Sequence, residues 1–276
     1  MKKLIVIPVI LLLIISTALL GCEAEPDNGN GAENGADNGD NGAQVGNGRE
    51  DGTFSAASEA DDRGYVHADV TFEDDEITEV ELAEFNDKGI EKGEDYDWDP
   101  FHEAMDELPE RFKEANDSDI EVYTEATGTS EKAMGAVDKA IQRAEGETGA
   151  FDGTFLGTSE QTDDGWGVAW VTLDNEEISE VKLEEVTLTD EEDEEYEFKD
   201  DDYQWEEWHE AKEAMPDWFV EENSSEVDVY TDATESSEMW MEAVEDALQK
   251  AGREEEAGEG ETEDEEEVGE EENGEE

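Results

Sequence analysis

The chain repeats itself, and this duplication constrains its fold more than any other feature of the sequence. The stretch 51–54, Asp-Gly-Thr-Phe, recurs at 152–155, an offset of 101 residues. Beyond an acidic insertion near 190–202 the offset becomes 107. Two copies of about one hundred residues fit the usual size of a domain, so the sequence predicts tandem domains at 51–145 and 152–251. The pairs aligned at the second offset are Trp98 with Trp205, His102 with His209, Pro109 with Pro216, Phe112 with Phe219, Tyr123 with Tyr230, Thr127 with Thr234 and Ser130 with Ser237.

The alternation of apolar and polar residues predicts a β-hairpin in each copy. Segments 64–72 and 77–85 alternate in the first copy, and 167–173 and 178–186 do the same in the second. A period of two is typical of strands with one face in water. Each copy is therefore expected to contain an antiparallel hairpin or sheet.

Helices are predicted after each hairpin. Segment 98–115 reads as a helix that Pro109 is expected to interrupt or end. A short strand is predicted at 120–123. The order of strands, helix, strand and helix predicts an α+β fold for each copy. Apolar residues at helical spacing predict the last helix: Ala133, Met134, Val137, Ala140, Ile141 and Ala144 in one copy, and Trp240, Val244, Ala247, Leu248 and Ala251 in the other.

A hydroxyl-rich motif precedes the last helix of each copy. It reads Val-Tyr-Thr-Glu-Ala-Thr-Gly-Thr-Ser at 122–130 and Val-Tyr-Thr-Asp-Ala-Thr-Glu-Ser-Ser at 229–237. The first turn of a helix has unpaired N–H groups and the positive end of the dipole, which together suit a phosphate. Serine and threonine are also common N-caps, so simple capping is the alternative interpretation.

The acid content restricts the partners of the chain. It has 88 Asp and Glu against 16 Lys and Arg, a formal net charge of −72. Nucleic acid is not expected as a partner, because binding it needs basic charge that displaces counterions. Acids spread over a folded chain repel one another in dilute buffer, and molar salt screens that repulsion. The balance predicts a protein adapted to high salt, with acidity that serves calcium binding as the alternative.

No metal site or catalytic residue is assigned from the sequence. Asp95, Asp97 and Asp99 alternate as in a calcium loop, but the second copy lacks this spacing, so an acidic turn is favoured. His102 and His209 have no Cys or His neighbours that would complete a zinc site. No Ser-His-Asp or Cys-His arrangement recurs between the copies, so no hydrolase is predicted.

The first 22 residues resemble the signal sequence of a bacterial lipoprotein. A basic start precedes an apolar run at 4–15 that is short for a membrane span. The stretch 19–22, Leu-Leu-Gly-Cys, resembles the lipobox, which implies diacylation of Cys22 and a firm membrane anchor. An ordinary signal peptide with a chance cysteine is the alternative. Cys22 is the only cysteine, so no internal disulfide forms.

The Asn- and Gly-rich segment 23–50 is predicted to be a disordered tether, and the acidic segment 252–276 is predicted to be a disordered tail.

Taken together, these features resemble the small FMN-binding domain family. It includes the flavinylated subunits of Na⁺-translocating NADH:quinone reductases and of Rnf complexes, and tandem-domain flavin lipoproteins of extracellular electron transfer. The Asp-Gly-Thr-Phe opening, the hairpin, the helix with an apolar-Pro pair (Leu108-Pro109 and Met215-Pro216) and the threonine motif are typical of it. The resemblance covers 51–145 and 152–251, and it implies at most one FMN per domain, bound covalently or non-covalently.

In covalent members of that family the motif reads Asp-x-x-Ser/Thr-Gly-Ala-Thr. A dedicated flavin transferase links the last threonine to FMN through a phosphoester. The resemblance places that threonine at Thr127 and Thr234, and the leading acid at Glu121 and Asp228. The other cofactor-binding positions that it implies are Thr124, Thr231, Ala126, Ala233, Ser130, Ser237, Tyr123 and Tyr230.

The glycine of that motif is absent from both copies. Glu125 and Asp232 take its place. Glycine allows a left-handed backbone or a close approach to a phosphate, whereas a carboxylate adds bulk and negative charge. Two like charges about 4 Å apart cost roughly 4 kcal/mol at an effective dielectric constant near 20. Either covalent flavin has been lost, or a salt-adapted relative tolerates the acid.

A bound flavin also needs a stacking surface in an apolar slot. Each candidate has the domain core as its alternative location. The candidates are Tyr123, Tyr230, Trp98, Trp205, Trp208 and Met134.

The expected function is that of an electron carrier, a lipoprotein attached to membrane lipid through Cys22 and facing the periplasmic or extracellular side. It would pass electrons from a membrane redox donor to an external acceptor, and a flavin transferase would load its FMN. The alternative is a cofactor-free binding or structural surface lipoprotein that keeps the fold. Whether the chain is itself an enzyme stays open, because nothing beyond the cofactor indicates a specific substrate.

Overall fold

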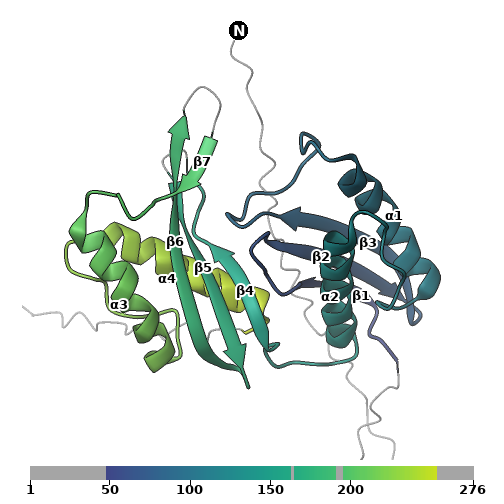
Figure 1. The fold of residues 1–276 in the computed structure, drawn as a ribbon. Helices are drawn as coiled ribbons and strands as arrows, with labels where there is room; N and C mark the ends of the chain where they lie inside the picture. The colour runs from purple at the N-terminus through teal and green to yellow at the C-terminus, as the bar shows by residue number, and fades with distance from the viewer. Residues whose placement is uncertain (1–47, 163–164, 191–194, 254–276) are drawn as a thin grey trace, which may run out of the picture. The chain divides into compact units, whose positions relative to one another are not determined.

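The computed structural model describes residues 48–162, 165–190 and 195–253. Within them the chain forms two antiparallel sheets and four helices in an α+β arrangement (Figure 1). The predicted signal sequence with Cys22 and nearly all of the predicted tether and tail lie outside the described residues. No helix among those described is both long and apolar enough to cross a lipid bilayer.

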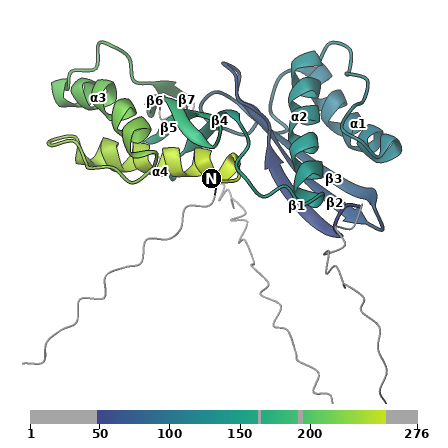
Figure 2. The ribbon, with the colours of Figure 1, turned by 90° about the horizontal axis from the view of Figure 1, so that it is seen from below.

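The first repeat places two helices on one antiparallel sheet. Its strand order is β1-β2-β3, and both helices pack on the sheet, α2 on β1 and β2 and α1 on β3 (Figure 2). The elements are β1 (Gly52–Ala57), β2 (Tyr65–Glu73), β3 (Glu76–Phe85), α1 (Asp99–Ala115) and α2 (Thr127–Ala144).

The second repeat has the same order with one strand added. The acidic insertion forms β7, which pairs antiparallel with β6 and was not predicted from the sequence. Helix α4 packs on β4 and β5, and α3 packs on β6. The elements are β4 (Gly153–Thr158), β5 (Gly165–Asp174), β6 (Glu177–Asp190), β7 (Glu195–Phe198), α3 (Glu206–Glu222) and α4 (Thr234–Lys250).

The predicted hairpins are confirmed in both repeats. Strand β2 pairs with β3 and β5 pairs with β6, each through a two-residue turn. Asp74 and Asp75 have φ of 52° and 71°, and Asn175 and Glu176 have 54° and 64°. Two consecutive residues with positive φ match the twist of the flanking strands. Local turn geometry therefore sets the register that the hydrophobic alternation indicates.

The prediction that Pro109 interrupts or ends the first helix is wrong. Pro109 and its counterpart Pro216 lie inside continuous helices, α1 and α3. A proline inside a helix removes one backbone hydrogen bond and costs about 3 kcal/mol. Buried Leu108 and Phe112 flank Pro109 and pack into the core. Tertiary packing holds the helix together across the proline.

The strand predicted at 120–123 is also wrong. These residues form an irregular loop in the first repeat, and their counterparts do the same in the second. Val122 is 39% exposed, and the Tyr123 N–H donates to the Ser130 hydroxyl at 2.8 Å rather than to a strand. Two apolar residues in alternation were too short a pattern to identify a strand.

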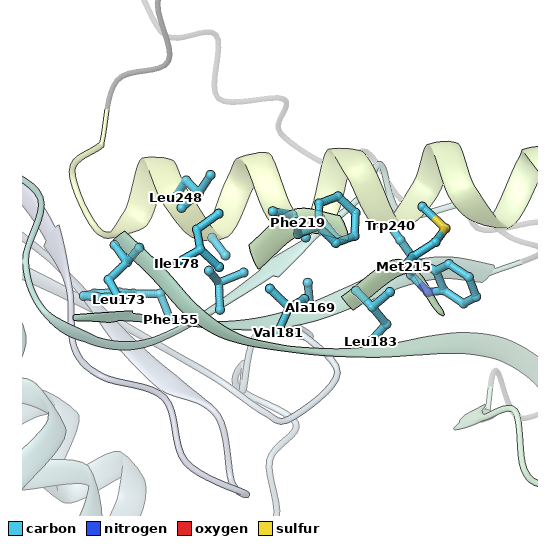
Figure 3. Packing of buried hydrophobic residues seen from close by; sticks show 14 of the residues in the cluster. Phe155, Ala169, Leu173, Ile178, Val181, Leu183, Met215, Phe219, Trp240 and Leu248 are labelled. Carbon is cyan, nitrogen blue, oxygen red and sulfur yellow. The ribbon is translucent and has the colours of Figure 1, made fainter. Parts of the chain in front are cut away.

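Each repeat encloses its own apolar core between helices and sheet. In the second repeat, Leu248 and Trp240 of α4 face Ile178 and Leu183 of β6 across the layer (Figure 3). Met215 of α3 completes that side of the core. The predicted last helices are confirmed, because their apolar faces are the ones that the core buries.

A third apolar cluster joins the two repeats. Tyr65 of β2 and Trp166 of β5 belong to it and are 4% and 2% exposed. The Trp166 indole N–H donates to the Lys88 carbonyl at 2.8 Å, and the Ala60 N–H donates to the Thr154 carbonyl at 2.8 Å. The repeats are therefore in direct contact across this cluster.

Candidate functional site

Both threonine motifs lie in a loop that leads into the last helix of the repeat. Thr127 and Thr234 are the first residues of α2 and α4, and both side chains are exposed. The N-cap residues are Ala126 and Ala233, which make no side-chain capping bond. The simple capping interpretation is therefore wrong for these threonines. Their hydroxyls lie instead at the helix end where N–H groups are unpaired.

A buried serine fixes each loop from inside. Ser130 Oγ accepts the Tyr123 N–H at 2.8 Å and donates to the Ala126 carbonyl at 2.9 Å. In the second repeat Ser237 makes the same two bonds, at 3.1 and 2.8 Å. Both serines are fully buried. Because their hydroxyls are used in these bonds, they shape the loop rather than face a ligand.

The residues at the motif-glycine position have a left-handed backbone. Glu125 has φ of 77° and Asp232 has φ of 66°. Non-glycine residues adopt this conformation at a cost of roughly 1–2 kcal/mol. Both loops therefore keep the backbone that glycine favours, although neither has glycine. The side chains of Glu125 and Asp232 are exposed, as are those of Thr124 and Thr231.

We expect Glu125→Gly to stabilise the first repeat. The change removes the left-handed penalty of about 1–2 kcal/mol and loses about 0.4–1 kcal/mol through the more flexible unfolded chain. A net gain of about 0.5–1 kcal/mol should appear in urea unfolding. Thr124→Gly is the matched control, because Thr124 is exposed and has no positive φ. Equal destabilisation by both changes would contradict the strain at Glu125.

The motif tyrosines hold the loop against the preceding helix. Tyr123 donates its phenol to Glu103 at 2.5 Å, and Tyr230 donates to Glu210 at 3.0 Å. These hydrogen bonds to carboxylates raise the pKa of both phenols. Arg111 lies over the Tyr123 ring, whereas Trp218 stacks on Tyr230 with ring centroids 6.0 Å apart. An aromatic surface thus lies beside each motif.

The other stacking candidates are distributed between surface and core. Trp98 is 41% exposed, and Trp205 and Met134 are half-buried. Trp208 is 1% exposed, and its indole N–H donates to Glu185 at 2.6 Å. Trp208 therefore belongs to the core and offers no free ring face.

A buried ion pair in each repeat was missed by the sequence analysis. Glu84 of β3 is 3% exposed and accepts from Lys92 at 2.5 Å. Its counterpart Glu185 of β6 is 5% exposed and is bound by Lys199. Ser236, two residues after Thr234, donates to Glu185 at 2.9 Å. The pair in the second repeat thus touches the first turn of the motif helix.

No group of three or more His, Cys, Asp and Glu side chains suited to a metal occurs within the described ranges. His102 and His209 instead pair their Nε2 atoms with the carbonyls of Tyr96 and Tyr203, at 2.6 and 2.7 Å. These histidines therefore connect a helix to the loop before it.

The motif residues fit the phosphate end of FMN better than its ring. Each loop presents an exposed threonine at a helix N-terminus, which suits a phosphate. Cavities of about 1030 and 360 Å³ have none of the motif residues in their linings. A cavity of about 210 Å³ lies beside the second motif, with Trp218 and Asp228 in its lining. It is smaller than the usual ligand pocket of about 300–1,000 Å³, so a flavin ring would lie near the surface.

Comparison with known proteins gives little further guidance. No family model and no curated protein matches the chain. Among solved structures, the CPE2226 protein from Clostridium perfringens is 26% identical and has a TM-score of 0.31. That match covers 35% of this chain and 89% of the other.

Proposed function

We propose that the chain is a membrane-anchored electron carrier of the FMN-binding type, with Thr127 and Thr234 as candidate attachment points. The observation that carries the proposal is the repeated loop. In both repeats an exposed threonine begins a helix, the preceding acid adopts a glycine-like backbone, and a buried serine holds the turn. The equivalent backbone geometry of the two loops thus presents Thr127 and Thr234 in the same way.

The residues have distinct roles in this proposal. The threonine hydroxyl would hold FMN as a phosphoester, and the N–H groups of the first helical turn would bind the phosphate oxygens. Making the ester requires a flavin nucleotide with a phosphoanhydride bond. That bond would break as the threonine oxygen bonds to the phosphorus of FMN, the other nucleotide would leave, and the hydroxyl proton would pass to the transferase. When bound, FMN supplies the redox chemistry, while the chain positions the group and tunes its surroundings.

The acid two residues before each threonine makes flavin loading depend on salt in this proposal. Glu125 and Asp232 place negative charge near a phosphodiester, at a cost of roughly 4 kcal/mol for charges about 4 Å apart at an effective dielectric constant near 20. Both carboxylates are exposed, so molar salt screens much of this repulsion. Flavin loading is therefore expected to be more complete in high salt than in dilute buffer.

The test is co-expression with a flavin transferase, followed by in-gel flavin fluorescence of the denatured protein. Wild type should fluoresce, and the Thr127→Val/Thr234→Val double variant should lose all of the signal. Thr148→Val, an exposed threonine outside the motifs, is the control and should retain it. Signal that persists in the double variant would reject these attachment points.

The alternative is a cofactor-free binding lipoprotein, favoured by the same two acids. Glu125→Gly/Asp232→Gly separates the two functions. If wild type carries no flavin, bound or covalent, and the double variant becomes loaded, the natural chain has lost the cofactor. If wild type is already loaded, the cofactor-free alternative is wrong.

A further inference from the structure

The cavity of about 360 Å³ lies on the outer face of the second sheet. Trp170 of β5 lines it and lies between Ala169 and Val171, which face the helices, so its side chain points to the opposite face. Phe198 of β7 lines it as well, and the two ring centroids lie 6.0 Å apart with the ring planes at 57°. The volume falls within the range of about 300–1,000 Å³ that is usual for ligand pockets.

The residues that form this cavity distinguish the second repeat from the first. Trp170 stands where the first repeat has Asp69, and Lys182 stands where it has Glu81. Phe198 belongs to β7, a strand for which the three-stranded first sheet has no counterpart among the described residues. The duplicated threonine motif therefore does not account for this cavity.

Carboxylates dominate the charged lining of the cavity. Two of them, Asp61 and Asp87, already pair with lysines. The other two, Asp62 and Glu180, are exposed, and neither has an ion pair within the described part of the chain. Lys182 is the one basic residue that the described ranges contribute to the lining. Four carboxylates and one ammonium group attract a cation and repel an anion such as a phosphate.

Both aromatic rings of the cavity present a face to a cation. Lys182 Nζ lies 4.2 Å from the centroid of the Trp170 ring, and Lys88 Nζ lies 4.8 Å from the centroid of the Phe198 ring. Lys182 is 60% exposed, and its ion pair with Glu184 is long, at 3.6 Å. A cation from solvent can therefore replace the Lys182 ammonium on the indole without breaking a buried contact.

The lining suits an alkylated ammonium ion better than a metal ion. Among the described residues, its carboxylates form no group of three or more that could hold a metal. Quaternary ammonium ions are recognised by aromatic faces, which contact the alkyl groups around the charge. A contact inside a partly enclosed cavity is also screened by salt less than an exposed ion pair. Two rings at an angle, with carboxylates beside them, match this chemistry.

We propose that this cavity binds a quaternary ammonium cation. The alkyl groups of the cation lie on Trp170 and Phe198, its charge lies near Asp62 and Glu180, and the Lys182 ammonium leaves the indole as the cation enters. None of the residues of the threonine motifs takes part. The site is therefore independent of the proposed flavin function, and the two proposals fail separately.

Calorimetric titration of the full chain without flavin, in molar NaCl, tests the inference. The probe is choline, and the comparison is its neutral analogue in which a carbon atom replaces the quaternary nitrogen. We expect one choline to bind per chain at roughly millimolar concentration, and the neutral analogue to bind about tenfold more weakly because it makes no cation–π contact. Equal affinity for the two compounds, or no saturable binding of choline by wild type, would overturn the inference.

Substitutions locate the binding site. Trp170→Leu should weaken choline binding about tenfold, whereas Trp98→Leu, at an exposed tryptophan outside the cavity, should leave it unchanged. Glu180→Gln alters an exposed side chain and keeps the test informative if Trp170→Leu prevents folding. It should weaken binding about twofold, and the same change at its first-repeat counterpart, Glu79, is the matched control. An affinity that neither Trp170→Leu nor Glu180→Gln lowers would place choline elsewhere and overturn the inference.

Lys182→Met tests the exchange of the two cations. It removes the ammonium that competes for the Trp170 ring, so choline should bind about threefold more tightly or better. Binding that occurs only in this variant would show that the lysine of the chain fills the cavity, and would overturn the inference for the natural protein. Choline binding by a chain that never accepts FMN would uphold this inference and reject the flavin function.

Discussion

Lys199→Met is expected to destabilise the protein by about 3 kcal/mol, because it leaves the Glu185 carboxylate buried without its counter-charge. The two side chains are only 12% and 6% exposed. Trp208 and Ser236 still donate to the remaining oxygen, which limits the loss to the lower end of the range for broken buried pairs. Urea unfolding of wild type and variant measures the difference.

Lys182→Met is the matched control for this prediction. Lys182 also pairs with a carboxylate, Glu184 at 3.6 Å, but its side chain is 60% exposed. An exposed pair contributes less than about 1 kcal/mol. Adding Glu185→Gln to Lys199→Met should recover much of the lost stability by removing the buried charge. Equal effects of Lys199→Met and Lys182→Met would contradict the burial of the Glu185 pair.

The unfolding free energy is expected to rise strongly with salt, which is the largest effect expected of any change in conditions. With a net charge of −72, many like charges lie within a Debye length of about 10 Å at 0.1 M salt. Two charges 10 Å apart in water repel by about 0.4 kcal/mol without salt and by about 0.15 kcal/mol at 0.1 M, so a few tens of such pairs amount to roughly 5 kcal/mol. At 1 M salt the Debye length falls to about 3 Å and most of this repulsion disappears.

Urea unfolding in about 0.1 M and 2 M NaCl tests the salt prediction. Glu81 lies directly opposite Asp69 in the first sheet, an unfavourable like-charge pair. Glu81→Gln should therefore stabilise the protein in low salt and have less effect in high salt. A stability that is equal in the two buffers would contradict the view that acid repulsion limits this fold.

Most of the few described basic side chains pack against aromatic rings. Ten of the fourteen described lysines and arginines lie over an aromatic ring. Partly buried charges are screened less by salt than exposed ones. These cation–π contacts are therefore expected to keep their strength under the conditions that relieve the acidic surface.

Periodicity predicted the elements that bury one apolar face, whereas tertiary packing and short strands account for the predictions that failed. The hairpins and the last helices follow from alternation and helical spacing, and both are present. The proline prediction failed because packing of Leu108 and Phe112 outweighs the broken hydrogen bond. Strands β1, β4 and β7 were missed because they are only four to six residues long.

The position of the candidate threonines in the fold was predicted correctly, whereas the buried glutamates near them were not. The duplicated motif correctly placed Thr127 and Thr234 at a helix N-terminus. The buried glutamates were missed because a charged residue in a strand is usually assigned to the solvent-exposed face of the sheet. Val80, Leu82 and Glu84 alternate along β3, and this spacing already assigns Glu84 to the core side. Only the structure shows that Ser236 donates to the counterpart of Glu84.

Intact-mass spectrometry of the chain, co-expressed with a flavin transferase in high salt and then denatured, tests the central claim most directly. The account predicts a mass gain equal to one or two FMN groups, which the Thr127→Val/Thr234→Val double variant abolishes. A mass gain that persists in the double variant would contradict attachment at these two threonines. An unmodified mass, with no flavin released on denaturation, would contradict the electron-carrier function itself.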